Sequence, residues 1–143
     1  MKKLFLVLLI VVQACMAFAQ NFSVDEPVYA SVDIPPHYLN GGDKGLLSDL
    51  YTIISETAPV SQDSVKGRAA VSFAVSKDGQ IDTDSIKVIR NRSVPDDYLK
   101  AAIEAIKKLG KFEPGKQLGT PKRVTYTIPV IYPAPPEYIK TNE

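Results

Sequence analysis

The sequence predicts an α+β fold, a small two-layer domain in which two helices cover one face of a three-stranded antiparallel sheet. Two segments, Arg68–Ser76 and Arg123–Ile131, alternate between apolar and polar or small side chains, as half-buried strands do. An Asp78-Gly79 pair follows the first of them and indicates a tight hairpin. Two other segments repeat apolar residues at helical spacing, which predicts two amphipathic helices.

The first predicted helix begins near Leu46. Asp43 precedes it, and a short carboxylate side chain is a suitable N-terminal cap. Residues 57–66 then break the helical pattern and are expected to form a polar connection. The apolar stripe of this helix comprises Leu46, Leu47, Leu50, Ile53 and Ile54.

A hairpin is expected next. In its first strand Val71, Phe73 and Val75 share one face. The turn at residues 77–80 contains a glycine that accepts a positive φ, and the second strand runs to about residue 91. Ile81 and Ile86 of that strand have opposite parity, so we expect a β-bulge within residues 82–85.

The second predicted helix lies between Pro95, suited to its first turn, and Gly110, suited to its end. Its apolar stripe comprises Leu99, Ala102, Ile103, Ile106 and Leu109. The last strand places Val124, Tyr126, Ile128 and Val130 on one face.

The connections predict the topology. A hairpin makes the first two strands antiparallel, and a right-handed helical crossover places the third strand beside the first. The sheet order is therefore 2-1-3, and the last strand is an edge. Pro129 is consistent with an edge, because proline lacks the donor that a central strand needs.

The first 19 residues resemble a cleavable secretory signal. A short positive start precedes nine apolar residues, Leu4–Val12, and Ala17-Phe18-Ala19 provides small residues for cleavage. Nine apolar residues are too few for a membrane span, which needs about 20. The alternative is a lipoprotein anchored at Cys15. We expect four segments: a signal peptide at 1–19, an extended lead-in at 20–42, the folded domain at 43–132 and a Pro-rich tail at 133–143.

Export would place the protein in the periplasm. The mature chain would have no transmembrane helix and no cysteine, and so no disulfide. It would carry 15 basic and 16 acidic residues, a balance that argues against nucleic acid as a partner. A local excess of cations between residues 100 and 123 could steer an acidic partner or could be a solvated helix face.

The chemistry-bearing residues predict neither an enzyme nor a cofactor or metal site. His37 is the sole histidine and lies in a Pro-rich segment, where a solvated role is more common than catalysis. Asp78, Asp82 and Asp84 around Gly79 could suggest calcium, but the spacing fails at both ends of the loop pattern. An unpaired edge strand remains, and it could accept an extended peptide or pair with a second copy of the chain.

The order of several motifs resembles the TonB C-terminal domain family over roughly residues 35–132. Gly41-Gly42 and the helix after it fit the lead-in of Bacteroidetes-type members. Phe112 stands where many members have tryptophan. The motifs are Val65-Lys66-Gly67-Arg68 with Val71-Ser72-Phe73-Ala74-Val75 and Asp78-Gly79-Gln80-Ile81, Phe112-Glu113-Pro114-Gly115-Lys116 with Gly119-Thr120-Pro121, and Val124-Thr125-Tyr126-Thr127-Ile128-Pro129-Val130.

The resemblance implies a periplasmic domain that pairs its last strand with a short segment of an outer-membrane receptor, the TonB box. A working TonB also keeps an uncleaved membrane helix, whereas a signal peptide is expected here. The resemblance therefore implies a non-enzymatic binding module for an outer-membrane receptor or another envelope protein. Alternatives are a homodimer with exchanged strands, or an energy transducer if the N-terminal helix stays uncleaved. The implied partner-binding residues are Arg123, Val124, Thr125, Tyr126, Thr127, Ile128 and Pro129.

Overall fold

The computed structural model describes residues 27–57 and 64–140. The predicted signal segment, with Cys15, lies outside the described residues, as do the lead-in before Pro27 and the last three residues of the tail. Within the described ranges, no helix is long and apolar enough to cross a membrane.

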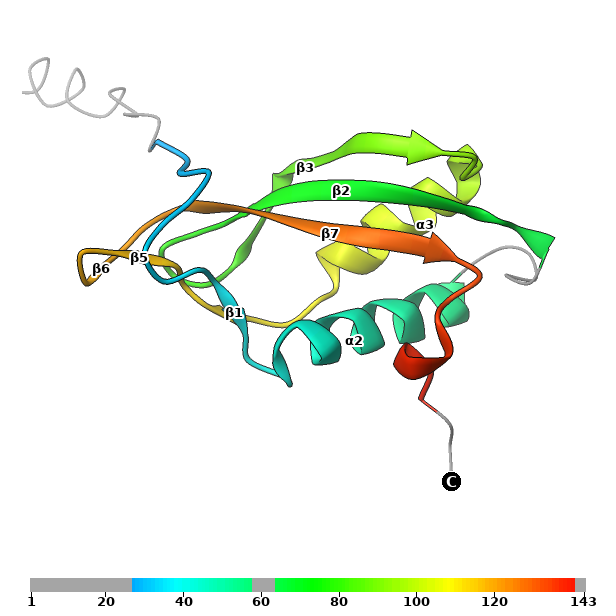
Figure 1. The fold of residues 1–143 in the computed structure, drawn as a ribbon, viewed down its shortest axis with the longest axis horizontal. Helices are drawn as coiled ribbons and strands as arrows, with labels where there is room; N and C mark the ends of the chain where they lie inside the picture. The colour runs from blue at the N-terminus through cyan, green and yellow to red at the C-terminus, as the bar shows by residue number, and fades with distance from the viewer. Residues whose placement is uncertain (1–26, 58–63, 141–143) are drawn as a thin grey trace, which may run out of the picture.

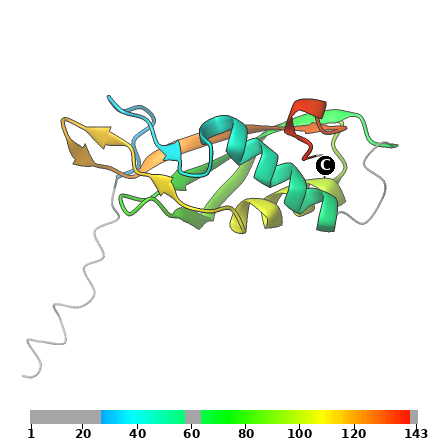
Figure 2. The same cartoon turned by 90° about the horizontal axis from the view of Figure 1, so that it is seen from below.

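A three-stranded sheet forms one layer, and two helices form the other (Figures 1 and 2). Its order is β3-β2-β7, with the central strand antiparallel to both neighbours, so the predicted fold class and sheet order are confirmed. The elements are β1 (His37–Tyr38), α2 (Gly42–Thr57), β2 (Gly67–Val75), β3 (Ile81–Arg92), α3 (Asp96–Lys107), β4 (Phe112–Glu113), β5 (Lys116–Gln117), β6 (Thr120–Pro121), β7 (Val124–Tyr132) and a 3-10 helix (Pro136–Tyr138).

Helix α2 buries the stripe that its sequence predicts. Leu46, Leu50 and Ile54 are fully enclosed between the helix and the sheet. The prediction that Asp43 caps this helix is wrong, because Asp43 lies inside its first turn. The Asp43 carboxylate instead accepts a hydrogen bond from the hydroxyl of Tyr126, which ties the start of α2 to β7.

Helix α3 lies where the sequence predicts it, with Pro95 at its N-cap position and Lys108 at its C-cap. Gly110 lies beyond the end, and its backbone N–H donates to the hydroxyl of Tyr38 over 3.1 Å. The side chains that α3 buries are Tyr98, Leu99, Ala102, Ala105 and Ile106.

The hairpin between β2 and β3 has the predicted turn. Gly79 adopts a φ of +80°, and a Cβ there would lie 1.9 Å from the carbonyl oxygen of Phe112, so only glycine fits. The predicted bulge is also confirmed, since the register of β3 against β2 shifts between Lys87 and Asp82. At this shift the hydroxyl of Ser85, in place of a backbone carbonyl of β3, accepts a hydrogen bond from the backbone N–H of Ala74 at 2.7 Å.

Aromatic rings fill the core beneath the sheet. Phe112 lies at the centre, with ring centroids 5.1 Å from Tyr38, 6.1 Å from Phe73 and 5.3 Å from Tyr126. These contacts are edge-on, the geometry that aromatic pairs favour. Phe112 is 2% exposed, so it anchors the segment that leads from α3 to β7.

Two short ladders were not expected from the sequence. β1 pairs with β4, which brings Tyr38 into the core. β5 pairs with β6 through a turn in which Leu118 and Gly119 both have positive φ, and this arm projects from the sheet beside the start of β7 (Figure 1).

Candidate functional site

The edge of the sheet formed by β7 is the candidate site. All nine residues of β7 pair with β2 in one register, from Val124 opposite Val75 to Tyr132 opposite Gly67, without a bulge. The strand is therefore regular along its whole length. The outer edge of β7 faces away from β2, and the strand runs above α2 in the view of Figure 1.

Alternation along β7 decides which groups point into the core. Val124, Ile128 and Val130 are at most 3% exposed and pack toward the helices. Tyr126 shares their side, where burial and then the hydrogen bond to Asp43 raise the pKa of its phenol. These side chains hold β7 against the core, and they leave its outer edge to the backbone.

The same alternation decides which backbone groups point outward. In a strand the N–H and C=O of one residue lie on the same side, and the sides alternate along the chain. The N–H groups of Thr125 and Ile131 both bond to partners outside the sheet, so these residues, with Thr127 and Pro129 between them, present their backbone outward. Thr127 and Pro129 are also exposed.

The first part of this outer edge is covered by the lead-in. Tyr29 donates its backbone N–H to the carbonyl of Arg123 at 2.8 Å and accepts from the N–H of Thr125 at 2.9 Å, forming a parallel bridge. Ile34 makes a similar backbone pair with Lys116 in β5. The lead-in therefore already occupies the outward groups at the beginning of β7.

The end of the outer edge is covered by a side chain. Tyr51 of α2 accepts a hydrogen bond from the N–H of Ile131 at 2.9 Å through its hydroxyl. Burial, the largest influence, raises the pKa of this phenol. The ring of Tyr138 stacks on Tyr51, with centroids 6.0 Å apart. Tyr51 thus joins α2, β7 and the tail.

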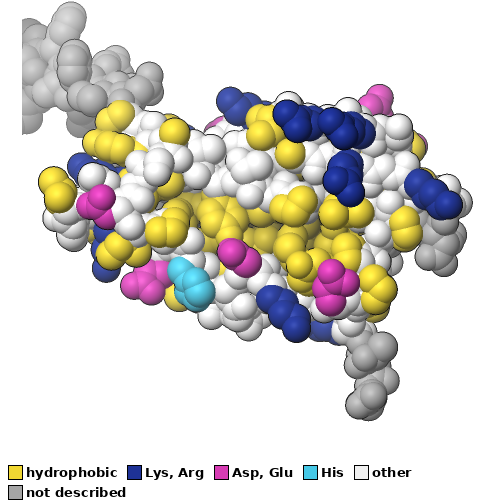
Figure 3. All heavy atoms as spheres, in the orientation of Figure 1, with side chains coloured by type: hydrophobic (Ala, Val, Ile, Leu, Met, Phe, Trp, Pro, Cys, Tyr) yellow, Lys and Arg dark blue, Asp and Glu magenta, His cyan; other side chains and the backbone are white. Residues whose placement is uncertain are grey.

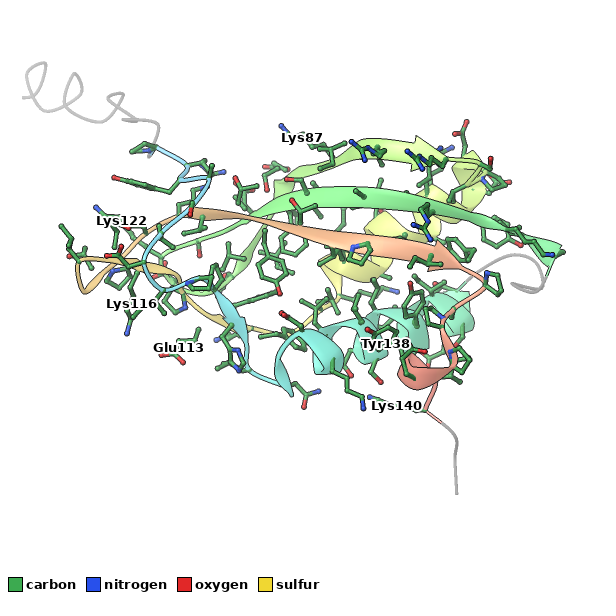
Figure 4. The ribbon with its side chains drawn as sticks, in the orientation of Figure 1. Lys87, Glu113, Lys116, Lys122, Tyr138 and Lys140 are labelled. Atoms are coloured by element: carbon green, nitrogen blue, oxygen red, sulfur yellow. The ribbon has the colours of Figure 1, made fainter. Side chains whose placement is uncertain are left out.

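The tail folds onto α2 and leaves the middle of β7 uncovered. Ser48 donates to the carbonyl of Tyr138 at 3.2 Å, and the ammonium of Lys140 lies 2.8 Å from the carboxylate of Asp49. Figure 4 shows Tyr138 and Lys140 beside α2. A pocket of about 330 Å³ separates the tail from the second half of this helix.

A short open window remains between these two covers. It contains the carbonyl of Thr125, the N–H and carbonyl of Thr127, and the carbonyl of Pro129. Within the part of the chain that the structure describes, the N–H of Thr127 donates to no acceptor. Pro129 has no N–H to leave unpaired, and at this outward position its ring costs the sheet no hydrogen bond.

The predicted site residues therefore have different environments. Thr127 and Pro129 present backbone groups outward, at the open part of the edge. Val124 and Ile128 direct their backbone groups to β2 and their side chains to the core. The carbonyl of Arg123 accepts a hydrogen bond from the N–H of Tyr29, and its guanidinium forms an ion pair with Asp82 across the sheet. The sequence did not indicate Tyr29 or Tyr51 as covers of the edge. The helical spacing of Tyr51 from Leu47 and Ile54 was a signal for its inward direction.

The other residues weighed for chemistry lie apart from this edge. His37 is exposed in β1, with its ring against Gly42. Asp82 pairs with Arg123, and its carboxylate accepts from the N–H of Asp84 at 3.1 Å, so both carboxylates belong to the hairpin and its bulge. Among the described residues, no three His, Cys, Asp or Glu side chains converge as metal ligands would.

Comparison with known proteins identifies one family. The profile of the family described as Gram-negative bacterial TonB protein C-terminal matches residues 61–133. A longer solution structure of the Helicobacter pylori TonB C-terminal domain is 26% identical, covers 66% of this chain and 86% of its own, and superposes with a TM-score of 0.40. A shorter structure of the same Helicobacter pylori domain is 28% identical. The match covers 61% of this chain and 91% of that structure, with a TM-score of 0.41. No curated protein matches the chain.

Proposed function

Because the chain belongs to the TonB C-terminal domain family, we propose that it is a non-enzymatic binding module of the periplasm. In this proposal it pairs the outer edge of β7 with an extended segment of an outer-membrane receptor or another envelope protein. The observation that carries the proposal is the open window around Thr127 in a strand that is otherwise regular.

The geometry of the window supports strand addition. An incoming chain can accept from the N–H of Thr127 and donate to the carbonyls of Thr125, Thr127 and Pro129. Main-chain hydrogen bonds of this kind supply affinity without requiring a fixed side-chain sequence. The window is about 13 Å long at about 3.4 Å per residue, so it suits a segment of about four residues.

The bridge to Tyr29 limits how far a peptide can extend. A longer peptide that also pairs with Arg123 and Thr125 has to displace the lead-in from its two hydrogen bonds. These bonds are a small obstacle, since a typical net contribution is about 1 kcal/mol each. The full site Arg123–Pro129 is therefore reached in two steps, first at Thr127 and then by exchange of the lead-in.

A peptide titration followed by NMR tests the proposal. The matched variants are Thr127→Pro, which removes the one free N–H of the window, and Thr127→Val, which keeps it. We expect a valine- and threonine-rich peptide to shift the amide signals of Thr125 and Thr127 in the wild type and in Thr127→Val. Thr127→Pro should remain folded and lose the binding.

Two outcomes would contradict the proposal. Equal binding by Thr127→Pro and Thr127→Val would place the peptide elsewhere. A concentration-dependent dimer in sedimentation velocity, abolished by Thr127→Pro, would assign the edge to a second copy of the chain instead.

A further inference from the structure

A second surface lies on the face of the sheet that no helix covers. Cross-strand partners share a face, so Arg68 of β2 stands beside Arg92 of β3, and Ala70 stands beside Arg90. Lys87 lies opposite Ser72 on the same face. Figure 3 shows Lys and Arg side chains gathered over β3 and the adjoining part of β2, and Figure 4 marks Lys87 among them.

A pocket of about 330 Å³ opens at one end of this face. Three cationic side chains line it from two strands and the segment before them: Lys66, Arg68 and Arg92. All three residues are exposed, and no ion pair or hydrogen bond engages their side chains within the described residues. Positive charge is therefore concentrated around this pocket, and no carboxylate among the described residues pairs with it.

The backbone around the pocket is closely packed. A Cβ on Gly67 would lie 2.7 Å from the carbonyl oxygen of Arg92, so the absence of a side chain allows the two strands to approach there. Ser93, which also lines the pocket, has a φ of +65°. The close approach brings Arg68 and Arg92 together as direct cross-strand neighbours.

Two like charges directly opposite each other destabilise an antiparallel pair. Arg68 and Arg92 form such a pair, and Lys66 adds a third positive charge beside them. Nothing in the packing requires these charges, because the side chains project from the uncovered face. Their grouping opposes the stability of the fold, and such a local conflict is expected where a residue serves binding.

The pocket is continuous with the β7 edge. Its remaining lining residues are Ile131 and Tyr132, the last two residues of β7. A peptide that pairs at Thr127 and continues past Pro129 leaves the edge before Ile131, whose N–H is bonded to Tyr51, and crosses the uncovered face over Ile131 toward the pocket. The flank of the bound segment therefore meets the three cations.

We propose that the pocket formed by Lys66, Arg68 and Arg92 binds carboxylate side chains that flank the strand-forming segment of the partner. This inference rests on the proposed pairing at β7 and adds the chemistry of the partner. Two of the three cations are arginines, whose planar guanidinium groups match a carboxylate with two parallel hydrogen bonds. The whole chain has a net charge of only +1, so it lacks the extended positive field that nucleic acid or a membrane surface would require.

The test compares two synthetic peptides with one valine- and threonine-rich core. One peptide is flanked at both ends by Asp-Glu and the other by Asn-Gln. Flanking both ends places a test residue near the pocket whether the peptide pairs parallel or antiparallel to β7. We expect the acidic peptide to bind the wild type about tenfold more tightly at low salt, as two carboxylates paired with exposed cations can together provide. It should also shift the amide signals of Gly67 and Ser93, which the neutral peptide leaves unmoved.

Matched variants locate the effect. The double variant Arg68→Gln/Arg92→Gln should bind both peptides equally and should be at least as stable as the wild type in thermal unfolding, because a repulsive pair is removed. The control Lys100→Gln/Lys108→Gln makes the same change of charge on and beside α3 and should keep the preference. A large loss of stability in the first double variant would assign the arginines to the fold and overturn the proposal.

The remaining outcomes separate this inference from the proposed function. If both peptides shift Thr127 and bind equally, the carboxylate site is overturned and pairing at β7 stands. If the acidic peptide shifts Gly67 and Ser93 but not Thr127, the pocket binds carboxylates and pairing at β7 is overturned. If neither peptide shifts any signal, both are overturned. Binding to phosphatidylglycerol vesicles that Arg68→Gln/Arg92→Gln loses, without a preference between the peptides, would replace the carboxylate by a lipid phosphate.

Discussion

The two edges of the sheet are built in opposite ways. β7 pairs with the central strand through nine consecutive residues, whereas the pairing of β3 is broken at two places, next to Ile89 and at Ser85. β3 also carries exposed cations, which together with bulges discourage a strand from pairing there. The comparison indicates that β3 is protected against association by its own sequence. β7 is instead covered at its two ends, by the backbone of Tyr29 and by the hydroxyl of Tyr51, with a window between them.

The largest expected difference between the two edges concerns two isoleucines. Ile128 in β7 is 3% exposed, whereas Ile89 in β3 is 53% exposed. We expect Ile128→Ala to lower the free energy of unfolding by about 2–5 kcal/mol, because it leaves a cavity. Ile89→Ala should change it by no more than about 0.5 kcal/mol. Urea denaturation of the two variants measures both, and similar losses would contradict the contrast.

The bulge in β3 depends on Ser85. Its hydroxyl accepts from the N–H of Ala74 and donates to the carbonyl of Asp82 at 2.6 Å. Ser85→Ala leaves the donor of Ala74 unsatisfied in a partly buried position, so we expect a loss of about 1–3 kcal/mol. Thr83→Ala, at an exposed position of the same strand, is the control. An unchanged urea midpoint for Ser85→Ala would mean that the bulge does not need this hydroxyl.

The cover at the end of β7 depends on the hydroxyl of Tyr51. Tyr51→Phe keeps the ring and its stacking on Tyr138 but removes the acceptor for the N–H of Ile131. We expect a loss of about 1 kcal/mol in stability. The exchange of the Ile131 amide with solvent deuterium should accelerate, and unchanged exchange would show that another group protects it.

The smallest expected effect concerns the ion pair between Arg123 and Asp82, which links the two edges across β2. Both side chains are partly exposed, so solvent screening reduces the contribution of the pair to stability. Arg123→Gln should cost no more than about 1 kcal/mol. The cost should decrease as salt is added, and a loss independent of salt concentration would instead point to packing of the arginine stem.

The elements with regular periodicity could be predicted from the sequence. The strands, both long helices, the Asp-Gly turn and the sheet order follow from local alternation and connection rules, and the bulge near Ser85 follows from the parity of Ile81 and Ile86. The assignment of Asp43 as a cap failed because Gly42 itself begins the helix. The β1–β4 ladder could not be foreseen, since two-residue strands have no period and pair over a long sequence separation.

The candidate site was predicted in part for the same reason. Regular alternation identifies β7, and Pro129 supports its edge position, but the covers at Tyr29 and Tyr51 depend on contacts distant in sequence. The cationic pocket was also missed. The cations that stand out in the sequence lie within residues 100–123, whereas only the strand register brings Arg68 beside Arg92.

Hydrogen exchange at the amide of Thr127 tests whether the middle of the β7 edge is open. The window around Thr127 predicts that its N–H exchanges rapidly in the free protein, while that of Val130, which faces β2, exchanges slowly. A saturating strand-forming peptide should slow exchange at Thr127 at least about tenfold, as a new main-chain hydrogen bond does. Slow exchange at Thr127 in the free monomer, or no change on adding the peptide, would mean that β7 is not an open binding edge.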